Sequence, residues 1–306
     1  MTRLKRKRFY VLALIFAGLA WILWPIYGFL SNQYETVRLP WGWVELPAEA
    51  PIGTSHVKPA YIEAGEKGTE ILETRLAKIG APSLSAAISV NGELVWANAV
   101  GWENVSQNKA ASHETIYRIG STSKAVMEAA ANEPFNALMS SRVFAPNNLT
   151  ALQPAHDVPQ KAVFYQTKGS KVKPWRSVDL SHKLAAGGYA ATPSDLAILG
   201  AAWLNDDFIP AHIREVFWTP LPISNDQDYA LGFRRKTWPI DGVGEVEHLN
   251  HGGVSKGAQC WLMIIPEHNM TLAISINRRT ENFSDFASAA FDLLEVFIPA
   301  AQDANP

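Results

Sequence analysis

Cysteine is almost absent from this chain, with Cys260 as its single example among 306 residues. One cysteine cannot form an intrachain disulfide, so a disulfide-stapled fold is excluded. The eight histidines are scattered, and neither an H-x-x-x-H nor a C-x-x-C pair occurs, so the sequence implies no metal and no organic cofactor. Cys260 itself lies in the apolar run AQCWLMII, which predicts a packed strand residue rather than a nucleophile.

An excess of basic charge is also missing, except at the start of the chain. Five of the first eight residues are Arg or Lys, and the remainder carries 22 basic against 29 acidic residues. A mildly acidic body offers no electrostatic surface for nucleic acid. The basic cluster alone is compatible with nucleic-acid binding or with targeting, but the segment that follows it indicates a membrane.

Charged residues are absent from residues 9–30, FYVLALIFAGLAWILWPIYGFL. An α-helix of this length reaches roughly 33 Å, enough to cross a bilayer. Trp21, Trp24 and Tyr27 cluster toward its far end, where an aromatic belt is expected. The sequence therefore predicts an uncleaved, single-pass anchor with its basic flank in the cytoplasm and the rest of the chain exported. A cleaved signal peptide is the alternative, but the run is long for one and no A-x-A-like site follows it.

The rest of the chain divides into a linker and one domain. Residues 31–60 are rich in proline and glycine and predict a tether, and residues 61–306 form the predicted domain. The patterns predict helices at 62–79, from Ser121 onward with an interruption at Pro134, from an N-cap at Thr192 or Ser194, and at 283–297. They predict strand pairs around Asn91-Gly92 and around PEHN. Residues 148–180 are expected to be irregular. This order predicts an α+β fold in which helices flank an antiparallel sheet.

A serine followed three residues later by a lysine offers the first candidate site. This S-x-x-K spacing begins at Ser55, Ser106, Ser121 and Ser170, so the spacing alone selects none of them. Ser121 opens an alanine-rich helical segment, where Lys124 lies on the same face. A desolvated lysine can lose its proton and activate a serine, and the N–H groups of a helix N-terminus can stabilise an oxyanion. The alternative is a serine that caps the helix beside a solvated lysine.

Several segments together resemble the serine hydrolases of the β-lactamase and penicillin-binding type, which include class C β-lactamases, D-Ala-D-Ala carboxypeptidases and related esterases. The segments are APSLSAAISVNGELVWANAVGWEN, ETIYRIGSTSKAV, EPFNALMSSRVFAPNNL, LAAGGYAATPSDLAILGAAWL, YALGF and HGGVSKGAQCWLMIIP. Each is loose alone, but they follow one another in the family's order and cover most of residues 80–295.

The resemblance implies roles for five residues. Ser121 would be the acylated nucleophile, and Lys124 would be its partner. His251-Gly252-Gly253 stands where the family has its K-T-G strand segment. This strand would line the cleft, supply a backbone N–H to the oxyanion hole and hold a substrate carboxylate. The alternative for His251 is an ordinary polar residue before a Gly-Gly turn.

The family's middle motif, Y-x-N or S-x-N on a helical subdomain, is missing between Lys124 and His251. Here STSKAV runs almost directly into MEAAANEPFNALM, which resembles a segment that the family carries after a long helical insert. We therefore expect an internal deletion near residues 126–127 and a reduced helical subdomain. The resemblance implies that the lost tyrosine would relay a proton to the leaving group. Tyr117 and Tyr165 are the conceivable substitutes.

The sequence thus indicates a membrane-anchored, exported serine hydrolase. It would transfer the acyl group of a small-molecule or peptide amide or ester to Ser121 and then hydrolyse it, with weak turnover. One alternative is a catalytically silent family member that binds peptidoglycan-like peptides or a protein partner. Another is the product of a damaged gene without a selected function.

The charge pattern at the N-terminus generates a prediction about topology. A reporter enzyme that works only after export, fused behind Pro306, should be active because the basic flank keeps the N-terminus in the cytoplasm. A reporter that works only in the cytoplasm should be inactive at the same position. Activity of the cytoplasmic reporter, or a mature N-terminus near Ser31, would contradict the anchor.

Overall fold

The structure is a computed structural model that describes residues 3–33, 42–126, 135–176, 178–221 and 228–304. It divides into two compact units, Met1–Trp43 and Val44–Pro306. Each unit is described by itself below.

The first unit contains one long helix, α1 (Arg3–Gln33), with Pro25 inside it. Its stretch Lys7–Tyr27 is long and apolar enough to cross a membrane, and its side chains are not buried by other parts of the protein. An N-terminal signal sequence has the same length and composition. The helix is therefore a candidate membrane span.

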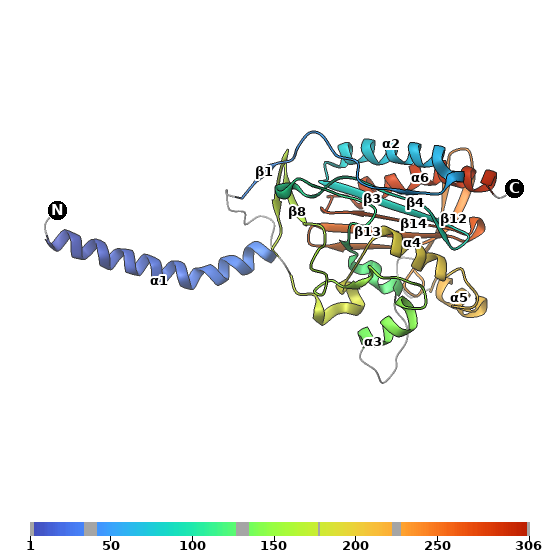
Figure 1. Cartoon of the computed structure of the whole chain (residues 1–306). Coiled ribbons are helices and arrows are strands. Elements are labelled where there is room, and N and C mark those ends of the chain that lie inside the picture. Colours follow the sequence, from blue (N-terminus) through green and yellow to red (C-terminus); the bar gives the residue numbers. More distant parts are fainter. Residues whose placement is uncertain (1–2, 34–41, 127–134, 177, 222–227, 305–306) are drawn as a thin grey trace. The chain divides into compact units, whose positions relative to one another are not determined.

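An antiparallel sheet forms the centre of the second unit (Figure 1). Its strands in spatial order are β11 (Arg234–Ile240), β12 (Gly244–Ser255), β13 (Ala258–Ile265), β14 (Met270–Ile276), β3 (Ser83–Val90), β4 (Glu93–Asn104) and β2 (His56–Val57), with β5 (Lys109–Ala110) beside β4. Two small sheets accompany it, one of β1 (Val44–Glu45), β9 (Lys171–Pro174) and β8 (Tyr165–Lys168), the other of β6 (Tyr117–Arg118), β10 (Tyr189–Ala191) and β7 (Gln153–Pro154).

Helices cover both faces of the central sheet, which confirms the predicted α+β class (Figure 1). The helices are α2 (Ile62–Ile79) and α6 (Phe283–Ala304) on one face, α4 (Pro193–Ala202) on the other, and α3 (Phe135–Met139) and α5 (Ala211–Trp218) beyond α4. Short 3₁₀ turns lie at Pro59–Tyr61, Val105–Gln107, Gly120–Val126 (η3), Ser181–Lys183 and Pro266–His268, and single π-helical turns at Ser140–Phe144 and Leu184–Gly188. The cap of α4 is Thr192, whose hydroxyl accepts a hydrogen bond from the Asp195 N–H.

Successive side chains of the strands point alternately into two separate hydrophobic cores. All eight residues of β13 are buried. Trp261 and Met263 enter the core beneath α2 and α6, whereas Cys260 and Leu262 enter the core beneath α4. Successive side chains of a strand point to opposite faces, so a strand that is covered on both faces must be apolar throughout.

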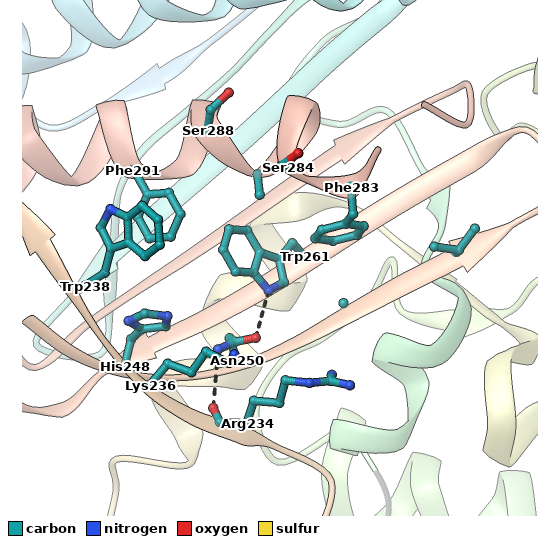
Figure 2. A pocket seen from close by; sticks show the side chains of 13 residues that line it. Arg234, Lys236, Trp238, His248, Asn250, Trp261, Phe283, Ser284, Ser288 and Phe291 are labelled. Atoms are coloured by element: carbon teal, nitrogen blue, oxygen red, sulfur yellow. Dashed lines mark hydrogen bonds between the residues drawn. The ribbon is translucent and has the colours of Figure 1, made fainter. Parts of the chain in front are cut away.

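The same alternation divides β12 into two functional faces. His248 and Asn250 point toward the α6 side of the sheet (Figure 2). The odd-numbered residues His251 and Gly253 therefore point to the opposite face, where the η3 turn lies.

Both predicted hairpins are present. Asn91 and Gly92 have φ values of 52° and 80°, as a two-residue type I′ turn between β3 and β4 requires. The PEHN segment forms the turn between β13 and β14, with Asn269 at a φ of 44°. Asparagine tolerates this left-handed region better than most residues, so both turns follow from local sequence.

Two expectations meet a different arrangement. Residues 44–60, expected in the linker, contribute β1 and β2 to the sheets of the second unit. The 148–180 region, expected to be irregular, contains β7, β8 and β9. Strands of two to four residues carry no detectable period, and their pairing partners lie far away in the sequence. The expected junction at 126–127 borders residues 127–134, which lie outside the described part of the chain.

Aromatic packing joins α2, the sheet and α6. The Phe297 ring on α6 lies 5.1 Å from the Trp96 ring and 6.5 Å from the Tyr61 ring. A Cβ added at Gly68 of α2 would come within 3.0 Å of both Phe297 and Trp96, so glycine there admits both rings.

Removing this ring tests how far the core depends on it. Phe297→Ala should lower the free energy of unfolding by about 3–5 kcal/mol, because Phe297 is fully buried and leaves a cavity. The exposed control Val216→Ala should change it by less than about 0.5 kcal/mol. Denaturant unfolding of the full chain measures both. Equal effects of the two substitutions would contradict the packing described here.

Candidate active site

Ser121 and Lys124 lie on the η3 turn, a 3₁₀ helix rather than the predicted α-helix. Residues three apart are eclipsed in a 3₁₀ helix, so both start from the same face of the turn. Ser121 is half-buried and Lys124 is exposed. The predicted continuation through Met127 to Pro134 lies outside the described residues.

The exposure of Lys124 differs from the expected chemistry. Activation of the serine by a neutral lysine requires burial that disfavours the ammonium. The structure does not supply that burial at Lys124, which projects a side chain accessible to water. In this arrangement the residue offers positive charge next to the serine rather than a desolvated amine.

Two glycines bring the η3 turn into backbone contact with β12. Gly120 has a φ of +52°, and a Cβ there would lie 2.8 Å from the Val254 nitrogen. A Cβ at Gly253 would lie 1.8 Å from the Ile119 carbonyl oxygen. No side chain fits at either position without moving the backbone. The predicted neighbourhood of Ser121 and the Gly253 strand is therefore present.

Further contacts fix the turn in this position. The buried Thr122 hydroxyl donates a hydrogen bond to the His251 carbonyl oxygen at 3.3 Å. The Ile119 N–H donates to the Tyr189 carbonyl oxygen at 3.2 Å. A Cβ added at Gly187, in the loop before β10, would lie 3.2 Å from the Gly120 carbonyl carbon. Two segments that are distant in sequence, 187–189 and β12, thus contact the residues on either side of Ser121.

His251 is buried, and its hydrogen bonds define its tautomer. Its Nδ1 lies 2.9 Å from the Gly252 carbonyl oxygen, and its Nε2 lies 3.3 Å from the Tyr229 hydroxyl. A carbonyl can only accept, so Nδ1 carries the proton and donates it. Nε2 is then the acceptor, and the Tyr229 hydroxyl donates to it.

The surroundings of His251 keep the ring neutral. Burial is the largest influence and lowers its pKa to about 4. The Gly252 carbonyl opposes this shift, while the positive charges of Lys124 and Arg234 add to it. At neutral pH the imidazole is therefore uncharged, and its Nε2 lone pair accepts the hydrogen bond from the Tyr229 hydroxyl.

Tyr229 is the site residue that the sequence reasoning missed. It begins the YALGF segment, whose turn folds back so that Tyr229 pairs with Arg234. The Arg234 guanidinium lies 4.8 Å from the centre of the Tyr229 ring, a cation–π geometry. A Cβ added at Gly232 would lie 3.5 Å from the Lys124 carbonyl oxygen, so this turn also borders the η3 turn.

The two tyrosines considered as substitutes have structural surroundings instead. The Tyr117 hydroxyl lies 3.0 Å from the Ser83 hydroxyl, and burial raises the pKa of Tyr117 far above its ordinary value. The Tyr165 hydroxyl accepts a hydrogen bond from the Val105 N–H at 2.7 Å. Both side chains are buried, and their hydroxyl groups are hydrogen-bonded to Ser83 and Val105 rather than to His251. YALGF was visible in the sequence, but nothing local linked its tyrosine to His251.

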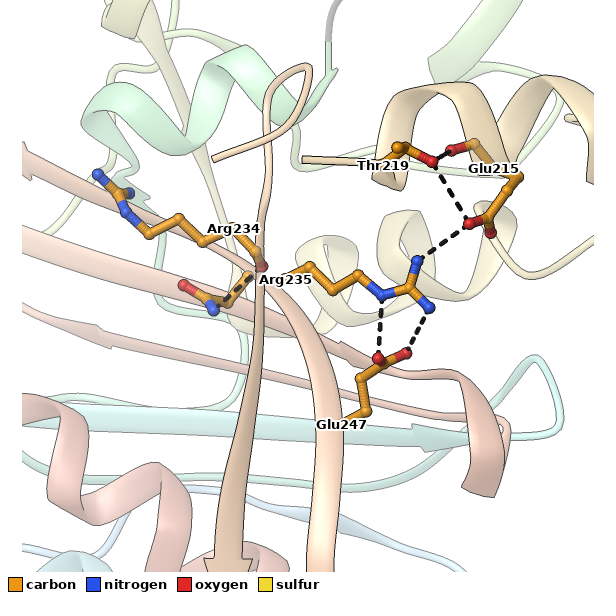
Figure 3. A network of polar contacts seen from close by, with 6 residues as sticks. Glu215, Thr219, Arg234, Arg235 and Glu247 are labelled. Carbon is orange, nitrogen blue, oxygen red and sulfur yellow. Dashed lines mark hydrogen bonds and ion pairs between the residues drawn. The ribbon is translucent and has the colours of Figure 1, made fainter. Parts of the chain in front are cut away.

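An ion-pair network anchors the strand that carries Arg234. Arg235 makes a two-pronged contact with Glu247 of β12, at 2.9 and 3.0 Å, and reaches Glu215 of α5 at 3.0 Å (Figure 3). Bidentate arginine–carboxylate pairs restrict orientation as well as distance. This network fixes β11 against β12 and α5, and thereby helps to position Arg234 near Tyr229.

Cys260 is a packed residue of β13. Cys260 pairs with Gly253 across the β12–β13 ladder and is fully buried. Burial raises the pKa of its thiol to about 12, so the predicted packed role is confirmed and a thiolate nucleophile is excluded. Among the residues that the structure describes, no cluster of three or more His, Cys, Asp or Glu could hold a metal ion.

The lowered pKa of His251 generates a prediction about acid stability. The unfolded chain takes up a proton on this ring near pH 6.5, whereas the folded chain does so only near pH 4. Unfolding is therefore favoured as the pH falls from 6.5 to 4, by up to about 3 kcal/mol at the lower limit. His251→Gln should remove this part of the pH dependence, while the exposed control His212→Gln should keep it. Urea unfolding between pH 6.5 and pH 4 measures this pH dependence. If the unaltered chain and His251→Gln lose stability equally over this range, His251 is not buried in its neutral form.

Comparison with known proteins gives one consistent result. The Beta-lactamase family model matches residues 69–131 and 125–297. Among solved structures, a penicillin-binding protein homologue from Pyrococcus abyssi has a TM-score of 0.58 at 14% identity, with 78% of this chain and 77% of that chain covered. D-amino acid amidase from Ochrobactrum anthropi SV3 has a TM-score of 0.64 at 12% identity, with 78% and 99% covered. A D-stereospecific amidohydrolase from Streptomyces sp. has a TM-score of 0.57 at 14% identity, with 74% and 98% covered.

No curated protein matches the chain. The solved structures are only 12–14% identical to this chain, so they show that the fold is shared. The family model spans well over half of the chain and includes the η3 turn, the YALGF turn and β12. On this evidence the chain belongs to the Beta-lactamase family.

Proposed function

We propose that the chain is a Ser121-dependent hydrolase that cleaves small amides or esters through an acyl-enzyme. The observation that carries the proposal is the backbone contact between the η3 turn and β12, which Gly120 and Gly253 permit. This contact brings a half-buried serine to a strand whose N–H groups can face a substrate carbonyl.

In the proposed reaction the Ser121 oxygen attacks the carbonyl carbon. The bond to the amine or alcohol breaks, and the leaving group takes up the proton that the serine gives off. Water then attacks the acyl carbon, releases the acid and returns the proton to Ser121. Lys124 favours negative charge developing on the serine oxygen, and the strand at Gly253 supplies the oxyanion donor.

The Tyr229–His251 pair is the candidate for the missing acid–base help. Neutral His251 accepts from the Tyr229 hydroxyl, which keeps the phenol oriented within the site. Because Nδ1 is committed to the Gly252 carbonyl, the pair has one hydrogen-bonding arrangement. We assign His251 the role of positioning the Tyr229 hydroxyl, which is the group that would give or take a proton.

The expected loss of an internal block argues for weak turnover. The family model matches in two stretches that meet at residues 125–131, where the sequence predicts the deletion. Without the middle motif, the Tyr229–His251 pair is the one proposed source of positioned proton transfer, which is typically worth about 10²–10⁴-fold. We expect slow cleavage of activated esters and amides, and little or no hydrolysis of β-lactams.

The names of the structural neighbours suggest the substrate class. One is a D-amino acid amidase complexed with L-phenylalanine amide, and another is a D-stereospecific amidohydrolase. A small amide of an amino acid or peptide is the corresponding substrate for this chain. No cofactor takes part in the proposed reaction.

A silent binding protein is the second candidate function. The exposed position of Lys124 favours it, since the usual activation of the serine needs a buried lysine. Such a protein would hold a peptidoglycan-like peptide or a protein partner in the same cleft. In either case we propose that residues 9–30 anchor the chain and that the domain is exported.

Labelling of the serine separates the two functions. A fluorophosphonate probe should label the full chain, and slow cleavage of an activated ester should accompany the labelling. Ser121→Ala should abolish both. Ser106→Ala is the control, because Ser106 is an exposed serine in another S-x-x-K stretch. It should change neither the labelling nor the ester cleavage. Ester cleavage that survives Ser121→Ala would contradict the proposed nucleophile, and efficient turnover of a chromogenic β-lactam would contradict the predicted weakness.

Tyr229→Phe tests the role of this hydroxyl on the same assay. This substitution keeps the ring beside Arg234 and removes the hydroxyl that donates to His251. We expect kcat to fall by roughly 10²-fold with KM little changed, and the pH dependence of kcat to shift. A variant with an unaltered pH profile and kcat would show that Tyr229 only packs.

A further inference from the structure

A second pocket lies on the other face of β12, between the edge of the sheet and α6. Its volume is about 620 Å³, within the range of small-ligand sites. It is lined by the residues of β11 and β12 that point away from η3, by Trp261 and by the first turns of α6 (Figure 2). None of the residues to which we assign the hydrolase reaction lines it except Gly252, through its backbone.

Aromatic rings form a preassembled wall of this pocket. Trp238 stacks on Phe291 with centroids 4.5 Å apart and planes 16° from parallel. Trp261 meets Phe291 and Phe283 edge-on, at 5.5 and 5.8 Å. The Trp261 indole N–H donates to the Asn250 side-chain oxygen at 3.1 Å, which fixes the ring. Trp238 remains 48% exposed, so a large apolar face stands open beside the cavity.

The opposite side of the pocket is positively charged. Figure 2 shows Arg234 and Lys236 across the pocket from Trp261 and Phe283, and both line the same cavity as the rings. Among its described lining residues none is acidic, and burial lowers the pKa of His248, which leaves that ring neutral. Asp228 pairs with Lys236 at 3.0 Å, but both side chains are about half exposed. A pair in water is weak and leaves the ammonium able to meet a second anion.

We propose that this pocket binds a small anion with a flat aromatic body, such as an aryl carboxylate. The rings of Trp238 and Trp261 would take the apolar body, and Lys236 with Arg234 would take the negative group. The cavity holds a molecule of two fused rings with a carboxylate. Binding in this pocket does not depend on Ser121, although Arg234 also lies over the Tyr229 ring of the proposed hydrolase site.

Calorimetric titration of the full chain in nanodiscs, with empty nanodiscs as the blank, tests the proposal. The probe is 2-naphthoate, for which we expect a dissociation constant on the order of 100 μM. Its neutral counterpart, 2-naphthalenemethanol, should bind several-fold more weakly because it lacks the charge. Equal binding of acid and alcohol would overturn the charge assignment.

Three variants locate the site. Trp238→Ala should weaken naphthoate binding by about tenfold or more through loss of the stacked wall. Lys236→Gln should weaken it by roughly fivefold and leave the alcohol unchanged. The matched control Lys67→Gln removes an exposed lysine that is likewise paired with an acid, Glu63 on α2, and should have no effect. If naphthoate does not bind the unaltered chain, or binds Trp238→Ala as tightly as the unaltered chain, the proposal is wrong.

Discussion

Glycine at positions 120 and 253 allows the turn that carries Ser121 to lie directly against β12, and the rest of the site depends on that contact. Any Cβ at Gly253 would overlap the Ile119 carbonyl, so the two backbones can approach only where both side chains are missing. Thr122 then bonds to the His251 carbonyl across the contact. The proposed nucleophile and the strand proposed to bind the oxyanion are thereby held by backbone contacts rather than by flexible side chains.

The tautomer of His251 is defined by its hydrogen bonds, and its neutral charge state is defined by burial. The Gly252 carbonyl accepts from Nδ1, so the other nitrogen must accept from Tyr229. Burial lowers the pKa of the ring to about 4 and removes the positive form at neutral pH. Where the family has a lysine on this strand, this chain therefore presents a neutral acceptor and a phenol. The positive charge that acts on His251 comes from Lys124 and Arg234.

One strand serves two surfaces because its side chains alternate. The odd-numbered residues of β12 face the η3 turn, and the even-numbered residues face the pocket under α6. Arg234 touches both surroundings, since it lines that pocket and lies over the Tyr229 ring. The Arg235 network ties β11, which carries Arg234, to β12 and to α5.

The sequence by itself determined the elements whose signals are local. The hairpin at Asn91-Gly92, the helix 62–79 and the terminal helix depend on turn chemistry and on apolar spacing within a few residues. The segments around Ser121 and His251 follow one another in the family's order, and this was also sufficient to indicate the family. Only the tertiary structure decided that Lys124 is exposed, that Tyr229 rather than Tyr117 or Tyr165 meets His251, and that residues 44–60 join the sheets. These outcomes depend on contacts between residues far apart in the chain, and neither the period of a segment nor the spacing of a motif carries information about them.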